Sequence, residues 1–384
     1  MGKPKLIRVT TVPLSLEKLL EGQLGFMKNH FDVIAVSSDK NRLALYAKNE
    51  GVRHYSVNLT RKITPLRDIA VLIKMYRFFR KEKPQIVHTH TPKAGIVGMM
   101  AAWFARVPIR LHTVAGLPLM ETQGLKKKLL VIIEKLTYRF ANKVYPNSYG
   151  LKDYIVENKF CSAKKLCVLG KGSSNGIDVK YFSMEGYNTL FQKEFKEKMG
   201  ILKDDFVFIF VGRIVKDKGI VEFIDAFTSI QSTTISLLLV GPFEEDLDPL
   251  PLATLQTIKT HSKIVHVGYQ QDVRPFFAIS NALVFPSYRE GFPNVVLQAL
   301  AMGLPAIVSD INGCNEIITN NVNGLIIPKK DTHALANAMQ VFLGDSKTYQ
   351  DLAKNTRNSI VENYERSKYW SHLLAEYEAL LFQN

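Results

Sequence analysis

Short apolar runs alternate with helix-like periodicities along most of the chain, and this alternation limits the possible folds more than any other feature of the sequence. The first series contains strand-like runs at Leu6 to Thr10, Asp32 to Val36 and Ile86 to Thr89, with a helix predicted from Ser15 and another over Ala94 to Ala105. Buried strands joined by helical crossovers are typical of βαβ units. We therefore predict an α/β fold with parallel sheets that helices cover on both faces.

The alternation stops once and then starts again. Gly170-Lys-Gly-Ser-Ser-Asn-Gly176 concentrates glycine and serine, and no periodicity returns until about Phe191, which is typical of a linker. The first series ends with strands at 110–113 and 143–146 and with helices over 126–141 and from Tyr149. The second series has strands at 206–211, 236–240, 264–267, 282–285 and 306–309, and helices after Lys218, from Val273 and from Asn294.

The chain is long enough for two domains. Its 384 residues exceed what a single core usually holds, so we expect one domain over 1–180 and a second from 181. Ligands of open parallel sheets bind outside the carboxyl ends of the strands, and two such domains that face each other predict a cleft between them. The chain ends in a helical stretch, Tyr369 to Phe382, and periodicity alone does not show which domain it packs on.

The excess of positive over negative charge is confined to the first half of the chain. Residues 1–180 contain 32 Lys and Arg against 12 Asp and Glu, although the whole chain has a net charge of +15. Clusters such as Arg77 to Lys83 and Lys126 to Lys128 mix cations with apolar residues, which suits an anionic membrane surface or an acidic ligand. Nucleic acid is not expected as a partner, because no zinc-finger spacing, RNA-recognition motif or basic helix is present.

The sequence favours a cytosolic protein with reduced thiols. Its longest uncharged apolar stretch, Ala94 to Ala105, is too short to cross a bilayer, and the N-terminus has no signal-peptide pattern. Cys161, Cys167 and Cys314 are odd in number and form no CxxC or Cys/His cluster. This argues against both a disulfide framework and a structural zinc site.

The run from Tyr288 to Gln298 is the strongest candidate for a ligand site. It places Glu290 and Gly291 just before a helix predicted from Asn294. The first N–H groups of a helix have no partner within it and favour an anion such as a diphosphate. Gln298 lies one turn further in, where its amide can point at the same ligand as Glu290. An ordinary strand-loop-helix corner with a surface acid is the alternative.

A second signal follows the first strand of the second series. In Val211-Gly-Arg-Ile-Val-Lys-Asp-Lys-Gly219, a strand ends and a turn carries Arg213 and Lys218. Arg offers a planar fork to phosphate oxygens and Lys offers a mobile point charge, so the pair suits a diphosphate that gains charge as it leaves. Two solvated cations at a domain edge are the alternative.

Other polar residues give weaker signals. His112 closes a strand before a loop, where side chains face a cleft, although a lone His is more often structural. His88 and His90 share one face of a strand, as metal ligands would, but no carboxylate or Cys lies near them in sequence. Asp246 and Asp248 are formally a magnesium-binding pair and read more simply as a solvated turn. No P-loop, nucleophile elbow or dinucleotide fingerprint follows a predicted strand.

Together these residues resemble the retaining glycosyltransferases of family 4, which have the GT-B architecture of two facing Rossmann-like domains. The resemblance covers essentially the whole chain. It rests on motifs that occur in the family's order, namely Gly212-Arg213 with Lys218-Gly219, Val267-Gly268-Tyr269, Pro286-Ser287, Glu290 to Asn294, Gly303-Leu-Pro305 and Asn323-Gly324-Leu325.

The resemblance implies a role for each matching residue. It implies that Arg213 and Lys218 hold the donor diphosphate and that Glu290 contacts the donor sugar. It further implies that backbone amides near Gly291, Phe292, Pro293, Asn294 and Val295 complete the site, that Tyr269 lies beside the base and that His112 approaches the sugar. The C-terminal helix, 366–384, is expected to return to the first domain, which leaves 181–365 as the nucleotide-sugar domain.

The chain departs from the family at two places. The family has a second Glu eight residues after the first, where this chain has Gln298, and an amide cannot accept hydrogen bonds at both heavy atoms. Many relatives also carry a Gly-Gly pair in the N-terminal loop, where this chain has Val12 to Leu16. The first departure bears on nucleotide affinity and not on the type of reaction.

The expected function is transfer of a hexose-type sugar with retention. The donor is expected to be a nucleotide-diphosphate sugar with UDP as the nucleotide. The acceptor is expected to be a saccharide on a polyprenyl diphosphate at the cytoplasmic face of the cell membrane, as in capsule or O-antigen synthesis. No metal or other cofactor is expected. A nucleotide-sugar epimerase or hydrolase of the same architecture and an inactive nucleotide-binding scaffold are the alternatives.

Overall fold

The structure, a computed structural model, describes residues 2–60, 64–244 and 248–383. The chain divides into two compact units. Unit 1 comprises Met1–Gly176 together with Arg366–Asn384, and unit 2 comprises Ile177–Glu365. The change of unit falls at the last residue of the Gly- and Ser-rich segment, where short side chains and glycines disfavour a helix or strand.

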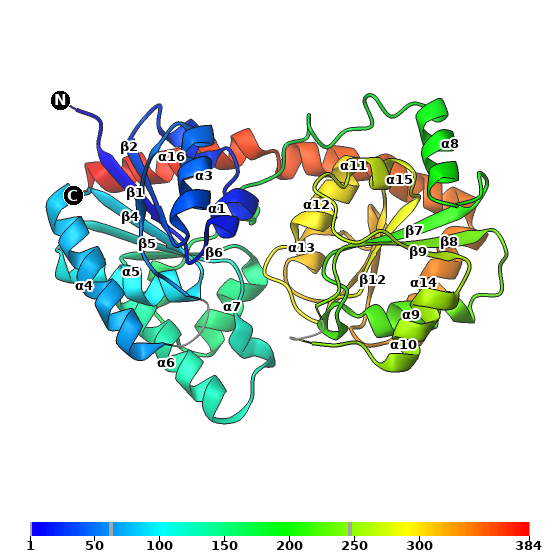
Figure 1. Cartoon of the computed structure of the whole chain (residues 1–384), viewed down its shortest axis with the longest axis horizontal. Coiled ribbons are helices and arrows are strands. Elements are labelled where there is room, and N and C mark those ends of the chain that lie inside the picture. The colour runs from blue at the N-terminus through cyan, green and yellow to red at the C-terminus, as the bar shows by residue number, and fades with distance from the viewer. Residues whose placement is uncertain (1, 61–63, 245–247, 384) are drawn as a thin grey trace. The chain divides into compact units, whose positions relative to one another are not determined.

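Unit 1 is built on a six-stranded parallel sheet, with the strand order β3-β2-β1-β4-β5-β6 (Figure 1). All of its strands except β3 are almost entirely buried, because both faces of the sheet are covered. The strands are β1 (Lys5–Val9), β2 (Asp32–Ser37), β3 (Arg53–Ser56), β4 (Ile86–His90), β5 (Ile109–Val114) and β6 (Lys143–Pro146).

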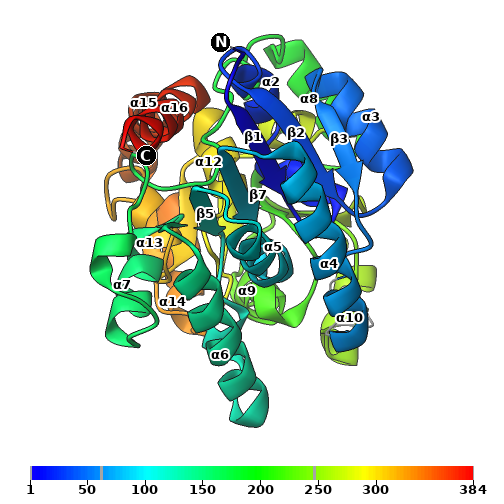
Figure 2. The same cartoon turned by 90° about the vertical axis from the view of Figure 1, so that its left-hand side faces the viewer.

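Alternate residues of each strand enter two separate cores. On β1, Ile7 and Val9 join one core and Leu6 joins the other, as the two-residue period of a strand requires. The first core is formed with α4 (Pro65–Glu82), α5 (Pro92–Phe104), α6 (Gly124–Phe140) and α7 (Tyr149–Glu157). The second is formed with α1 (Pro13–Leu19), α2 (Gln23–Met27), α3 (Lys40–Glu50) and α16 (Arg366–Phe382) (Figure 2). Short 3₁₀ turns occur at Pro118–Glu121 and Ala163–Lys165.

The C-terminal helix α16 packs on unit 1, although the helix that precedes it, α15 (Ser346–Asn363), belongs to unit 2. Tyr369, Leu373, Tyr377 and Leu380 are buried in the second core, beside residues of β1 and α2. Trp370 donates to the Asn175 side chain at 2.7 Å. These contacts tie the last residues of the chain to the first domain of the sequence.

Unit 2 repeats the architecture of unit 1. Its six parallel strands have the order β12-β11-β10-β7-β8-β9. The strands are β7 (Phe206–Val211), β8 (Ile235–Val240), β9 (Ile264–His266), β10 (Ala282–Phe285), β11 (Ala306–Ser309) and β12 (Gly324–Ile327). The helices are α8 (Thr189–Lys198), α9 (Ile220–Ser229), α10 (Leu252–Thr260), α11 (Arg274–Ala278), α12 (Asn294–Ala301), α13 (Cys314–Ile317), α14 (Thr332–Gly344) and α15 (Ser346–Asn363), with a 3₁₀ turn at Lys216–Lys218.

Both sheets therefore have a topological switch point. In unit 1 the chain winds away from β1 in one direction and from β4 in the other, and in unit 2 the same holds for β7 and β10. Ligands of open α/β sheets bind at such a point, outside the carboxyl ends of the strands. The predicted α/β class with two parallel sheets is confirmed.

The described residues show the state of the three cysteines and whether a helix could cross a membrane. All three cysteines are free, with Cys314 buried and the other two half-buried. Across 2–60, 64–244 and 248–383, no helix is long and apolar enough to cross a membrane.

Glu134 on α6 gives a test of the first core. Its side chain is buried, and this burial raises the pKa of the carboxyl to about 7. A carboxyl whose pKa is raised from 4.5 stabilises the fold below pH 4.5 and loses that contribution as the pH rises to about 7. Glu134→Gln is therefore expected to match the parent at pH 4 and to be more stable at pH 8, by on the order of 1 kcal/mol or more. Urea unfolding at both pH values measures this, and equal differences at the two would contradict it.

Candidate functional site

The loops that follow β7 and β10 meet at the switch point of unit 2. Lys218, in the loop after β7, forms an ion pair with Glu290, in the loop after β10. The Ser287 hydroxyl donates to the same Glu290 oxygen at 3.1 Å. Both charged side chains are mostly buried, at 14% and 18% exposure, so water screens the pair only partly. Two of the residues predicted for the site are thus brought into direct contact.

Glycine allows the backbones of these loops to approach one another. A Cβ on Gly219 would lie 2.1 Å from the Pro286 carbonyl oxygen, and the φ of this residue is +70°. A Cβ on Gly241, after β8, would lie 1.7 Å from the Gly212 carbonyl oxygen. Only a residue without a side chain fits at either contact. The loops after three neighbouring strands are held together in this way.

Arg213 lies in the same loop as Lys218 and is also paired with acids. Its guanidinium donates to Glu244 at 2.8 Å and lies 3.9 Å from Asp217. Burial acts to lower the pKa of Arg213, but the hydrogen bond to Glu244 and nearby carboxylates, Glu290 among them, raise it. The guanidinium therefore stays charged beside the Lys218 pair.

A third cation and its acid were missed by the sequence reasoning. Arg289 donates to Asp217 at 2.9 Å, and the Asp217 carbonyl accepts from the Tyr288 N–H at 2.9 Å. The sequence offered one signal for Arg289 as a site residue, because it stands directly before Glu290. Its pairing with Asp217 depends on the meeting of two loops and is not visible in the sequence.

The helix α12 begins at the predicted residue. Its N-cap is Pro293, whose side chain cannot form a capping hydrogen bond, and its first turn contains no acid. Asn312, in the loop after β11, donates to the Glu290 carbonyl and, at 3.3 Å, to the Gly291 carbonyl. Asn312 fixes the turn that leads into α12 and was also missed, although it follows a predicted strand end.

The remaining residues predicted for unit 2 surround this turn or lie further along the same edge. Phe292 is buried, whereas Val295 and Gln298 are half-buried on α12. Tyr269 follows β9 and has 63% of its surface exposed. All of them come from loops or helix starts at the carboxyl ends of the strands, where a ligand of such a sheet binds.

His112 belongs to unit 1, on β5, and faces the first core. Its Nδ1 lies 2.8 Å from the Thr89 hydroxyl, and its ring lies so close to Gly95 that a Cβ there would be 2.6 Å from the ring. Burial lowers the pKa of His112 to about 3. The imidazole is therefore neutral near pH 7 and can act through a hydrogen bond but not as a cation.

The described residues contain no group of three or more His, Cys, Asp or Glu side chains placed to hold a metal ion. His88 is bonded to Tyr377 and Thr113, at 2.6 and 2.7 Å. Asp246 lies outside the described residues. Its predicted companion, Asp248, accepts from the Asp217 N–H at 2.6 Å and so helps to shape the loop after β7.

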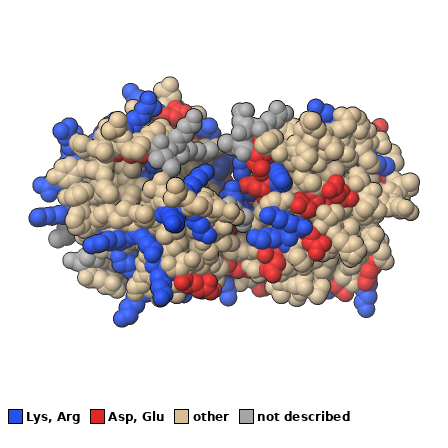
Figure 3. Space-filling model, turned by 90° about the horizontal axis from the view of Figure 1, so that it is seen from below, with Lys and Arg blue, Asp and Glu red and all other residues tan. Residues whose placement is uncertain are grey.

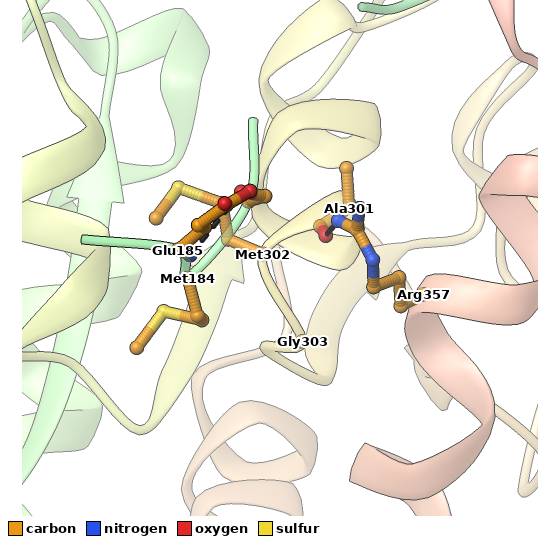
Figure 4. Close-up of a pocket in the computed structure, with 7 residues that line it drawn as sticks. Met184, Glu185, Ala301, Met302, Gly303 and Arg357 are labelled. Carbon is orange, nitrogen blue, oxygen red and sulfur yellow. Dashed lines mark hydrogen bonds between the residues drawn. The ribbon is translucent and has the colours of Figure 1, made fainter. Parts of the chain in front are cut away.

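A separate pocket of about 380 Å³ lies at the other end of α12 (Figure 4). Arg357 points into the region from α15 and donates to the carbonyls of Val179 and Phe182, at 2.8 and 2.9 Å, and of Ala301. These bonds use the guanidinium to join the end of α12 to the start of unit 2, which is a structural role. The lining residues are Ser183, Met184, Glu185, Ala301, Met302, Gly303 and Arg357.

Comparison with known proteins agrees with this geometry. Residues 191–359 match the family described as glycosyl transferases group 1, and residues 27–172 match the glycosyl transferase 4-like domain. The chain is 34% identical over 384 residues to the capsular polysaccharide biosynthesis glycosyltransferase CapM of Staphylococcus aureus, covering 99% of this chain and 98% of that protein. The chain belongs to glycosyltransferase family 4.

The chain is also similar to a second curated protein and to a solved structure. It is 29% identical over 375 residues to an Escherichia coli UDP-Gal:alpha-D-GlcNAc-diphosphoundecaprenol alpha-1,3-galactosyltransferase, covering 94% of each chain. Its fold matches that of Anabaena Alr3699/HepE, solved in complex with UDP and glucose, with a TM-score of 0.82, 16% identity and coverage of 98% and 100%. The architecture is accordingly GT-B, as the motifs predicted.

Gly219 gives a test of the loop contact at Lys218. Gly219→Ala places a methyl group against the Pro286 carbonyl at a positive φ, so we expect a loss of more than about 2 kcal/mol of folding stability. Gly344→Ala is the matched control, because a Cβ there meets nothing within 4 Å. Chemical denaturation of both variants measures the difference, and equal stabilities would show that the two loops do not depend on this contact.

Proposed function

We propose that this glycosyltransferase moves a hexose-type sugar, with retention of configuration, from a nucleotide-diphosphate sugar to a lipid-linked saccharide. The observation that carries the proposal is the Lys218–Glu290 pair at the switch point of unit 2, directly before the first turn of α12. A cation, a helix start and a carboxylate at one point suit a diphosphate joined to a sugar.

The leaving group explains the choice of residues. When the bond between the sugar and the diphosphate breaks, negative charge develops on the diphosphate. Arg213, Lys218 and the amides near Asn294 would stabilise that charge without reorganising. Glu290 would accept hydrogen bonds from the sugar hydroxyls. Because Arg213 and Lys218 would supply the positive charge, the reaction would not require a metal ion.

The same leaving group offers a route for the acceptor proton. The acceptor oxygen would form its bond to the anomeric carbon on the face that the diphosphate leaves, and its proton would pass to a diphosphate oxygen. One C–O bond forms as another breaks, and no covalent enzyme intermediate is needed. His112, neutral at pH 7, would orient the sugar by hydrogen bonding.

The names of relatives support the donor and the acceptor. The Escherichia coli relative uses UDP-Gal and an acceptor on diphosphoundecaprenol, and a Campylobacter jejuni relative, 29% identical over 276 residues, also acts on a diphospho-undecaprenol saccharide. Both names state an α linkage. We therefore infer a UDP-sugar donor and a polyprenyl-diphosphate acceptor for this chain, in surface polysaccharide synthesis.

An acceptor of this kind is embedded in a membrane, and unit 1 has a surface that suits one. The outer faces of α4, α5 and α6 carry exposed apolar side chains, and α4 and α6 place Lys and Arg among them. Figure 3 shows Lys and Arg gathered over unit 1. We call this surface the basic ridge; its exposed apolar residues are Leu66, Ile69, Ile73 and Tyr76 on α4, Trp103 and Phe104 on α5, and Leu125, Leu129 and Ile132 on α6.

The basic ridge is amphipathic in the way that interfacial helices are. On α4, Val71, Met75, Phe78 and Phe79 face the core, and the exposed apolar residues follow helical spacing on the other side. Apolar area and cations together bind anionic lipid surfaces. We infer that the protein binds peripherally to the inner face of the cell membrane through this ridge.

The donor site predicts the effect of removing its cations. Arg213→Ala and Lys218→Ala should each lower turnover by about 10²- to 10³-fold, because each removes charge stabilisation of the leaving diphosphate. A thermal-shift panel of UDP-, GDP- and ADP-sugars first identifies the donor, since a ligand of the folded state raises the melting temperature. Turnover is then measured with that donor.

Lys216→Ala is the matched control for Lys218→Ala. Lys216 lies in the same 3₁₀ turn but its side chain is exposed. Near-normal turnover of the Lys218 variant would remove this residue from the site. Free sugar or an epimer formed from the donor without an acceptor would instead favour a hydrolase or epimerase.

The basic ridge predicts salt-sensitive membrane binding. Leu66→Glu should reduce flotation with anionic liposomes several-fold, because it places a negative charge at the lipid surface. Leu252→Glu is the control, since Leu252 in unit 2 has the same 85% exposure as Leu66. Flotation is compared at low and high salt. A parent protein that stays with the aqueous fraction at both salt concentrations would contradict the membrane proposal.

A further inference from the structure

His88 and His90 lie two residues apart on β4 and are equally buried, but they differ in their hydrogen-bond partners. Both side chains are 1% exposed, and both point to the side of the sheet that α16 covers. His88 uses both ring nitrogens, with Tyr377 and Arg8 at Nδ1 and Thr113 at Nε2. Within the described part of the chain, neither ring nitrogen of His90 has a hydrogen-bond partner.

A buried imidazole without partners is costly. Leaving a buried donor or acceptor unsatisfied costs about 1–3 kcal/mol, and buried polar groups in proteins are almost always paired. Burial, and then the charge of Arg8, hold the pKa of His90 well below its usual range. The ring is therefore neutral, with one N–H donor and one nitrogen acceptor available.

The position of His90 is the counterpart of the donor site in unit 2. It is the last residue of β4, beside the end of β1, and this is the switch point of unit 1. In unit 2 the equivalent strand ends, of β7 and β10, lead to Lys218 and Glu290. The general rule for open sheets thus predicts a ligand at both places.

Other buried polar groups gather at the same edge of the unit 1 sheet. The side-chain oxygens of Gln23 and Asn147 are buried and, among the described residues, also lack partners. Both side chains contact Ser174, Gln23 at its carbonyl and Asn147 at its hydroxyl, at 3.2 and 3.5 Å. Thr91, next to His90, has a φ of +80° and is bonded through its hydroxyl to Thr11 at 2.7 Å. The described residues at this edge thus include several buried, uncharged polar groups.

We propose that His90 binds a hydroxyl group of the acceptor saccharide, at a subsite formed by the ends of β1 and β4 in unit 1. A sugar hydroxyl both donates and accepts, and it therefore matches a neutral imidazole that offers one donor and one acceptor. The proposal rests on the proposed transferase function. It adds a residue that contacts the acceptor and that the family motifs do not include.

The test is His90→Phe, which keeps the ring shape and removes both polar atoms. The substitution removes two buried ring nitrogens that lack hydrogen-bond partners among the described residues. The melting temperature of the variant should therefore equal or exceed that of the parent. Transfer of label from the identified donor to lipid should fall about tenfold or more at limiting acceptor. The acceptor is supplied by the membrane fraction of the organism that encodes the chain, and donor binding, measured by thermal shift, should be unchanged.

Two further variants separate binding from structure. His88→Phe is the matched control, and it should lower the melting temperature by several degrees because Arg8, Tyr377 and Thr113 lose a partner. His90→Asn keeps a donor and an acceptor and should restore part of the transfer lost in His90→Phe. His90→Leu, which also removes both polar atoms, replaces His90→Phe if that variant does not fold.

The outcomes distinguish this inference from the proposed function. No transfer to lipid by the parent protein would overturn the proposed function, and this inference with it. Transfer by the parent together with parental transfer by His90→Phe would overturn the inference alone, since the site would then hold water only. Weaker transfer by His90→Phe, together with the parental thermal shift when the donor is added, would support the inference.

Discussion

The Lys218–Glu290 pair exists because the strand order of unit 2 places β7 beside β10. These residues are far apart in sequence, and they meet only where the sheet reverses its winding. The contact also needs Gly219, whose missing side chain lets the first loop touch the Pro286 carbonyl. Topology and one glycine together bring a cation and a carboxylate to the start of α12. The rest of the candidate site is arranged around that point.

The cations of this site are kept in place by acids. Arg213 pairs with Glu244 and lies near Asp217, which also binds Arg289, and Lys218 pairs with Glu290. Such pairs lower the cost of holding cations in a partly buried loop. A diphosphate brings more negative charge than a single carboxylate and can replace one partner without leaving the cations uncompensated. The pairing is therefore compatible with the proposed diphosphate site.

Much of this arrangement can be read from the sequence, and the limits have physical causes. The strands at 206–211, 282–285 and 306–309 and the helix start at Asn294 have the predicted bounds because long apolar runs and a Pro leave few alternatives. The strands β3 and β12 were missed. β3 is polar and half exposed, with the sequence Arg-His-Tyr-Ser, and β12 begins with Gly, which disfavours a strand.

The functional residues divide in the same way. Arg213, Lys218 and Glu290 stand in recognisable motifs beside strand ends, so they can be named from sequence. Arg289, Asn312 and Asp217 act through contacts between loops that follow different strands, and these contacts depend on strand order. Periodicity carries no information about strand order. The difference in hydrogen bonding between His88 and His90 likewise depends on α16, a helix from the far end of the chain that supplies Tyr377 to His88.

The two units share one topology but differ in the chemistry of their switch points. In unit 2 the strand ends present paired charges, which suit a charged diphosphate. In unit 1 the strand ends present threonines and a neutral, buried histidine, which suit uncharged hydroxyls. A reaction that joins a phosphorylated donor to a saccharide needs both kinds of site. A repeated fold can supply them by changing only the residues that follow equivalent strands, because the sheets fix where a ligand binds and the loops decide what binds there.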